Sequence, residues 1–105
     1  MFLGMPVQKR EFKKLISLFK LDGWDIGLLQ TKQIPYYADE DDVSAVSFNP
    51  PDRTAQVWAP NVKGQRSNVI HELLHLLFED SGVEVDTEIE HRVIYTLEDV
   101  LAKVI

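Results

Sequence analysis

The segment His71-Glu72-Leu73-Leu74-His75 places two histidines four positions apart, with a glutamate between them. On an α-helix, side chains at positions i and i+4 lie on one face, so both imidazoles can bind a single metal ion. The carboxylate of Glu72 stands beside them, where it can act as a general base on a metal-bound water. This spacing predicts a Zn²⁺ site in which His71 and His75 are ligands and Glu72 is catalytic.

The residues around this segment make it apolar on almost every side. They are Val69, Ile70, Leu73, Leu74, Leu76, Leu77 and Phe78. A helix of this kind is buried, so its histidines need partners. Hydrogen bonds inside the core could satisfy them, with Glu72 facing solvent. All three histidines of the chain fall within residues 71–91, however, and this clustering favours metal binding.

A catalytic zinc site usually takes three protein ligands, so a third ligand is needed. The metzincin pattern is excluded, because Phe78 and Ser81 stand where it requires glycine and histidine. The remaining nitrogen and oxygen donors follow later in the chain. They are Glu84, Asp86, Glu88, Glu90, His91 and Glu98.

Helical periodicity favours Glu90 as the third ligand. Residues 87–105 carry one apolar stripe, formed by Ile89, Val93, Ile94, Leu97, Val100, Leu101 and Val104. Glu90 lies near its middle, where a carboxylate is costly unless it is paired or bound to a metal. In a helical hairpin around Gly82, at about 1.5 Å per residue, Glu90 is nearly level with His75.

Two simpler interpretations remain for this region of the sequence. Thr87 and Glu90 have the spacing of a capping box, which would explain Glu90 through helix stability alone. His91 lies at the margin of the stripe and is most simply a partly exposed surface residue. The sequence therefore leaves open whether Glu90 or another carboxylate completes the site.

The elements that position these residues follow the order α, β, β, β, α, α. A basic amphipathic helix is predicted over 7–20 and a strand over 24–29. Strands over 43–48 and 54–59 flank a turn and form a hairpin. The histidine helix is predicted over 68–80, with Ser67 as its N-cap and Gly82 at its end. We expect a single α+β domain over residues 1–105.

Composition narrows the class of partner. The chain has 11 basic and 17 acidic residues, a net charge of -6, and no cysteine. The negative charge argues against nucleic acid, and the lack of cysteine excludes disulfides and cysteine-based zinc sites. No apolar run reaches membrane-spanning length, and residues 1–10 lack the order of a secretory signal. We expect a cytoplasmic protein that does not bind membranes, and the sequence does not specify its oligomeric state.

Residues 66–78 and 88–94 resemble the two zinc-binding helices of gluzincins, which are zinc metallopeptidases. The second segment is similar to the glutamate helix of ImmA/IrrE-like, SprT-like and phage-encoded peptidase-like proteins, although His91 stands where the ImmA/IrrE pattern favours a small residue. The resemblance implies a minimal zincin-like domain with a small sheet, an active-site helix and a C-terminal glutamate helix. It also implies His71, His75 and Glu90 as ligands and Glu72 as general base.

The main hypothesis is thus a zinc metallopeptidase that acts on a peptide or protein substrate. The alternatives are a silent or latent zinc-binding regulatory or interaction module, and a structural domain without metal. We expect strand 54–59 to be an exposed edge that pairs with substrate, and Trp58 to line the cleft or to anchor the core. The sequence does not distinguish four possible oxyanion donors. They are Tyr36, Tyr37, His91 and Tyr95.

Overall fold

The chain forms a small α+β fold, described by the computed structural model for residues 6–82 and 84–104. Its elements follow the predicted order: α1 (Lys9–Leu18), β1 (Asp25–Leu29), β2 (Ala45–Asn49), β3 (Thr54–Trp58), α2 (Gln65–Asp80) and α3 (Thr87–Val104). Residues 1–5, part of the segment inspected for a secretory signal, lie outside this description. None of the helices in the described ranges has both the length and the apolar character needed to cross a membrane.

The three strands form a mixed sheet in the order β1-β3-β2. The predicted hairpin is confirmed, because β2 pairs antiparallel with β3, with Val46 opposite Val57. β1 pairs with β3 in parallel, from Asp25 opposite Thr54 to Leu29 opposite Trp58. The expectation that 54–59 is an exposed edge is therefore wrong, since β3 is the central strand. The periodicity of a hairpin does not reveal which of its two strands a third strand will join.

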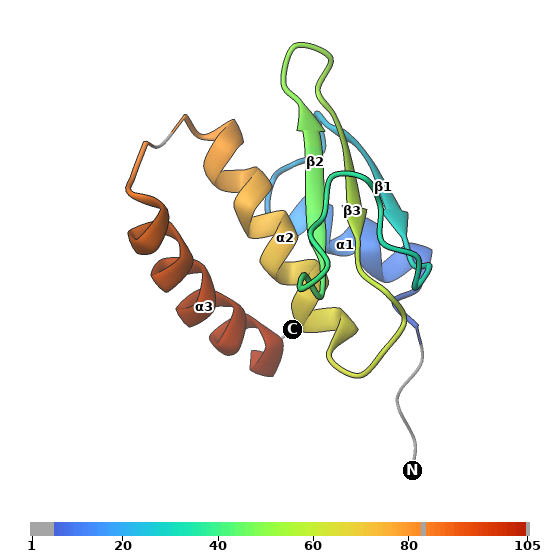
Figure 1. The fold of residues 1–105 in the computed structure, drawn as a ribbon. Helices are drawn as coiled ribbons and strands as arrows, with labels where there is room; N and C mark the ends of the chain where they lie inside the picture. Colours follow the sequence, from blue (N-terminus) through green and yellow to red (C-terminus); the bar gives the residue numbers. More distant parts are fainter. Residues whose placement is uncertain (1–5, 83, 105) are drawn as a thin grey trace.

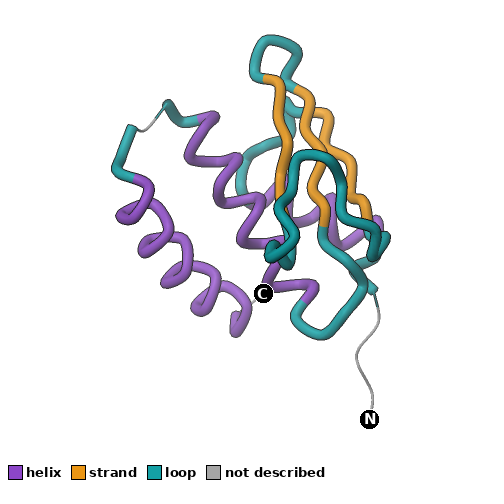
Figure 2. Tube along the Cα trace, in the orientation of Figure 1, coloured by secondary structure: helices purple, strands orange, loops and turns teal. Residues whose placement is uncertain are grey.

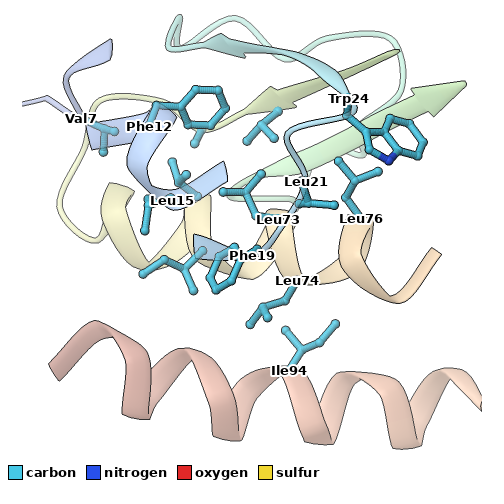
Figure 3. Packing of buried hydrophobic residues seen from close by; sticks show 14 residues of the cluster. Val7, Phe12, Leu15, Phe19, Leu21, Trp24, Leu73, Leu74, Leu76 and Ile94 are labelled. Carbon is cyan, nitrogen blue, oxygen red and sulfur yellow. The ribbon is translucent and has the colours of Figure 1, made fainter. Parts of the chain in front are cut away.

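The core fills the space between α1, the sheet and one side of α2. Phe12, Leu15 and Phe19 of the α1 region point into it, as the helical spacing predicts. Leu73 and Leu76 meet them from α2 (Figure 3). Helix α2 lies between the sheet and α3 (Figure 1), and the loop that joins β1 to β2 runs in front of the sheet (Figure 2).

Helix α2 begins three residues earlier than the sequence predicts. Its N-cap is Gly64, with a φ of 87°, so the prediction of Ser67 as the cap is wrong. Gln65, in the first turn, is buried and accepts a hydrogen bond from the Val7 backbone N–H at 2.9 Å. Its amide also donates to the Ala59 carbonyl at 3.0 Å. These tertiary bonds replace a local cap and fix where α2 starts.

Helix α3 turns a different face inward from the one its periodicity predicts. Ile94 is fully buried against α2, and Leu101 packs against the core. The rest of the predicted apolar stripe is exposed, namely Ile89, Val93, Leu97, Val100 and Val104. Asp86 caps the helix by accepting a hydrogen bond from the Glu88 N–H at 2.8 Å, and Glu90 contacts His75, so the structure does not form the capping box that was the alternative explanation of Glu90. The inward face of α3 is largely polar, and its polar side chains line a cleft between α3 and α2.

We expect Ile94→Ala to lower the free energy of unfolding by about 2–4 kcal/mol, because it removes buried methyl groups from the contact between α2 and α3. Ile89→Ala, at a position 54% exposed on the same helix, is the matched control and should cost well under 1 kcal/mol. Urea denaturation of the two variants measures both values. Equal losses would show that α3 packs through a different face.

Candidate functional site

An open cleft of about 550 Å³ lies over the polar side of α2. One wall is β2 with the loop before it, and the other is α3. His71, Glu72 and His75 face into it from α2, and Glu90, His91, Tyr95 and Glu98 line it from α3. The α2 residues reach the cleft because the opposite side of that helix, with Leu73 and Leu76, is committed to the core. The three polar residues of the histidine motif therefore share one cavity.

The two motif histidines point their Nε2 atoms at each other, 3.2 Å apart. Their ring centroids lie 4.8 Å apart, as expected for side chains one helical turn apart. Both side chains are largely buried. Burial lowers the pKa of His75 below its ordinary value, although its hydrogen bond to Glu90 opposes this shift. His75 is thus held in its neutral form, which is the form that binds metals.

A carboxylate from α3 contacts the other nitrogen of each histidine. Glu90 Oε2 lies 2.7 Å from Nδ1 of His75, and Glu98 Oε2 lies 2.9 Å from Nδ1 of His71. An ionised carboxylate only accepts hydrogen bonds, so each Nδ1 carries the proton and donates it. In a neutral ring the Nε2 atom is then an unprotonated acceptor. With both rings neutral, two lone pairs converge across 3.2 Å, an arrangement that a cation would stabilise.

The third histidine of the chain joins this pair. One ring nitrogen from each of His71, His75 and His91 lies within 4.8 Å of the other two, which is close enough to hold a metal ion. The ring of His91 lies 5.0 Å from that of His75, centroid to centroid, at an interplanar angle of 80°. Tyr95, one turn further along α3, places its ring 5.1 Å from that of His71. His91 is partly exposed, as the sequence analysis expects, and its ring also lies beside the histidine pair.

Glu72 lies in the same cleft, with only 6% of its surface exposed. Ser44, in the loop before β2, donates a hydrogen bond to Glu72 Oε2 at 2.6 Å. Burial raises the pKa of the Glu72 carboxyl above its ordinary value, while the Ser44 hydrogen bond and the nearby His71 lower it. A carboxylate with a raised pKa in a cleft is a better proton acceptor than an exposed one, which suits a general base.

The donor set can be tested against the needs of zinc. A tetrahedral zinc ion with Zn–N bonds of about 2.0–2.1 Å separates two ligand nitrogens by about 3.3 Å. The Nε2 atoms of His71 and His75 match that spacing at 3.2 Å. Both rings also carry the carboxylate partner at Nδ1 that metal-binding histidines usually have. The residues present fit the ion that the sequence predicts.

Several expectations from the sequence can be placed in this geometry. Glu90 is level with His75, as the hairpin argument predicts, and its carboxylate contacts Nδ1 of that ring rather than the helix cap. Trp58 is 2% exposed and donates from Nε1 to the Thr31 carbonyl at 2.8 Å, so it anchors the core and does not line the cleft. Among the four oxyanion candidates, His91 and Tyr95 line the cleft.

Sequence reasoning missed Ser44 and the role of Glu98. Ser44 lies 28 positions from its partner Glu72, and no local motif marks it. Glu98 had a weaker signal, since it follows Glu90 by eight positions, about two turns along α3 and roughly 80° further round the helix. Pairing Glu90 and Glu98 with two histidines on a neighbouring helix would have identified both contacts.

Comparisons of this chain with protein-family models, with curated proteins and with solved structures find no match. The function is therefore argued from the site itself.

We expect Zn²⁺ to stabilise the folded protein. Zinc at about 100 times its Kd adds about 2.7 kcal/mol to the free energy of unfolding, which raises the Tm of a domain of this size by about 10 °C or more. Differential scanning calorimetry measures this shift. His75→Ala should abolish it, and Mg²⁺, which prefers oxygen ligands, should produce none. An equal shift in wild type and His75→Ala would place the ion elsewhere.

Proposed function

We propose that this protein is a minimal, zincin-like, zinc-dependent peptidase. The observation that carries the proposal is the convergence of the His71 and His75 Nε2 atoms beside the buried carboxylate of Glu72 in an open cleft. A site that only stores zinc needs the histidines but has no need of a buried acid next to them. Glu72 therefore supports hydrolysis over the alternative of a silent zinc-binding module.

Each residue of the chain has a distinct chemical task in this proposal. His71 and His75 hold the ion, and α3 supplies the third ligand. Zn²⁺ in this position supplies Lewis acidity, which polarises a substrate carbonyl and lowers the pKa of water. Glu72 accepts the proton of the attacking water and delivers it to the leaving amine nitrogen. Ser44 holds the Glu72 carboxylate in place through its 2.6 Å hydrogen bond.

The cleft suits an extended peptide as substrate. β2 is an edge strand of the sheet, and its residues Ala45, Val46 and Phe48 line the cleft beside α2. A peptide can add to such an edge through backbone hydrogen bonds, which places its scissile bond over the polar side of α2. β2 thus takes the role that the sequence analysis assigned to residues 54–59. Asp41, Asp42 and Glu79 also line the cleft and favour substrates with basic side chains.

The decisive test replaces Glu72 with glutamine, which keeps the shape of the side chain and removes its basicity. We expect Glu72→Gln to retain zinc and to lower kcat for peptide hydrolysis by about 10²–10⁴-fold, the usual contribution of a general base. The assay uses the zinc-loaded protein with a library of peptides that includes lysine and arginine residues, and mass spectrometry detects the products.

Glu88→Gln is the matched control, because Glu88 is an exposed carboxylate that does not line the cleft. It should retain wild-type kcat. Hydrolysis that survives Glu72→Gln would contradict the assignment of the base. Zinc binding without hydrolysis of any peptide would support the silent or latent zinc-binding module instead.

A further inference from the structure

Helix α3 offers two neighbouring residues as the third ligand, Glu90 and His91, and they differ in which nitrogen of His75 they approach. Glu90 Oε2 lies 2.7 Å from Nδ1. The two nitrogens of an imidazole point away from each other, so this oxygen lies on the opposite side of the ring from an ion held at Nε2. Glu90 could bind that ion only by leaving Nδ1, and the N–H of a largely buried ring would lose its partner at a cost in stability.

Glu98 repeats this arrangement on the other histidine, 2.9 Å from Nδ1 of His71. The two carboxylates come from positions eight residues apart on α3 and enclose the histidine pair from both ends. A carboxylate at Nδ1 of a metal-binding histidine fixes the ring orientation and the tautomer. The duplicated contact is therefore the arrangement expected of two positioning residues behind two ligands.

His91 is the nitrogen donor that α3 brings close to both histidines of α2. Its ligand atom lies within 4.8 Å of the corresponding nitrogens of His71 and His75. Three ligands of a tetrahedral zinc ion need separations of about 3.3 Å, so the ring of His91 has to move by at most about 1.5 Å. Rotations of a side chain cover such a distance, and they are common when a ligand binds.

We propose that His91 is the third zinc ligand, and that Glu90 and Glu98 position His75 and His71 from behind. The inference rests on the proposed zinc function and names its ligand set. It assigns three neutral imidazoles to the ion, in place of the two imidazoles and one carboxylate that the sequence predicts. The two carboxylates then balance the charge of the ion from the outer shell rather than by direct contact.

The test measures zinc binding by the full chain, with Zn²⁺ alone as the probe. Affinities come from competition with a chromogenic chelator for wild type, His91→Ala, Glu90→Gln and Glu98→Gln. We expect each glutamine variant to weaken binding by about 10–100-fold, the range for outer-shell partners, and His91→Ala to weaken it by more than about 100-fold. Glu88→Gln, an exposed carboxylate on the same helix, is the matched control and should retain wild-type affinity.

X-ray absorption at the zinc edge separates a ligand from a structural role by counting imidazoles. We expect three in wild type and in Glu90→Gln, and two in His91→Ala. Thermal unfolding in a chelator checks that the metal-free variants remain folded. Two imidazoles in wild type, with unchanged affinity in His91→Ala, would overturn this inference while the zinc function stands. Wild-type protein that binds no zinc would overturn both.

Discussion

Helix α2 has to be covered on two sides, and the rest of the structure depends on this constraint. Its residues are apolar around most of the circumference, so the sheet and α1 cover one side and α3 covers another. The strip left between these two contacts faces the cleft, and it carries His71, Glu72 and His75. The same packing that buries the leucines of α2 therefore places these three titratable side chains along an open cleft.

The polar contacts of the cleft come at the expense of packing between helices. The inward side of α3 carries Glu90, His91 and Glu98, which leaves Ile94 and Leu101 as the apolar residues that hold α3 against the body of the protein. The remaining apolar residues of α3 face outward. In most of a protein the local sequence pattern agrees with the overall fold, and departures from this agreement are common at functional sites. Helix α3 departs from it where its polar residues, and not its apolar stripe, face the histidines of α2.

Electrostatics links the site into one unit. Burial raises the pKa of Glu72, and the nearby carboxylates of Asp42 and Glu98 add to this shift, while Ser44 and His71 stabilise its charged form. Carboxylates contact Nδ1 of each histidine, and the two Nε2 atoms converge across 3.2 Å in the cleft. A cation at that point would offset both the convergence of lone pairs and the local excess of negative charge.

The sequence by itself determined the local features of this protein. Apolar periodicity, turn residues and the break at Gly82 predicted the order of the six elements, the hairpin and the helix that carries His71 and His75. It also predicted that Glu90 would lie level with His75, because helix geometry fixes distance along a hairpin. These features depend on neighbours within a few positions of each other, and local patterns record such relationships well.

Tertiary structure alone decided how the elements face one another. The place of β3 at the centre of the sheet depends on the parallel pairing with β1, about thirty positions away. The start of α2 depends on the bonds that Gln65 makes to distant backbone groups, not on a local cap. Which face of α3 turns inward depends on the residues of α2 that it meets. That rotation brings Glu90, His91 and Glu98 to the two histidines, and a single helix viewed alone shows only its own apolar stripe.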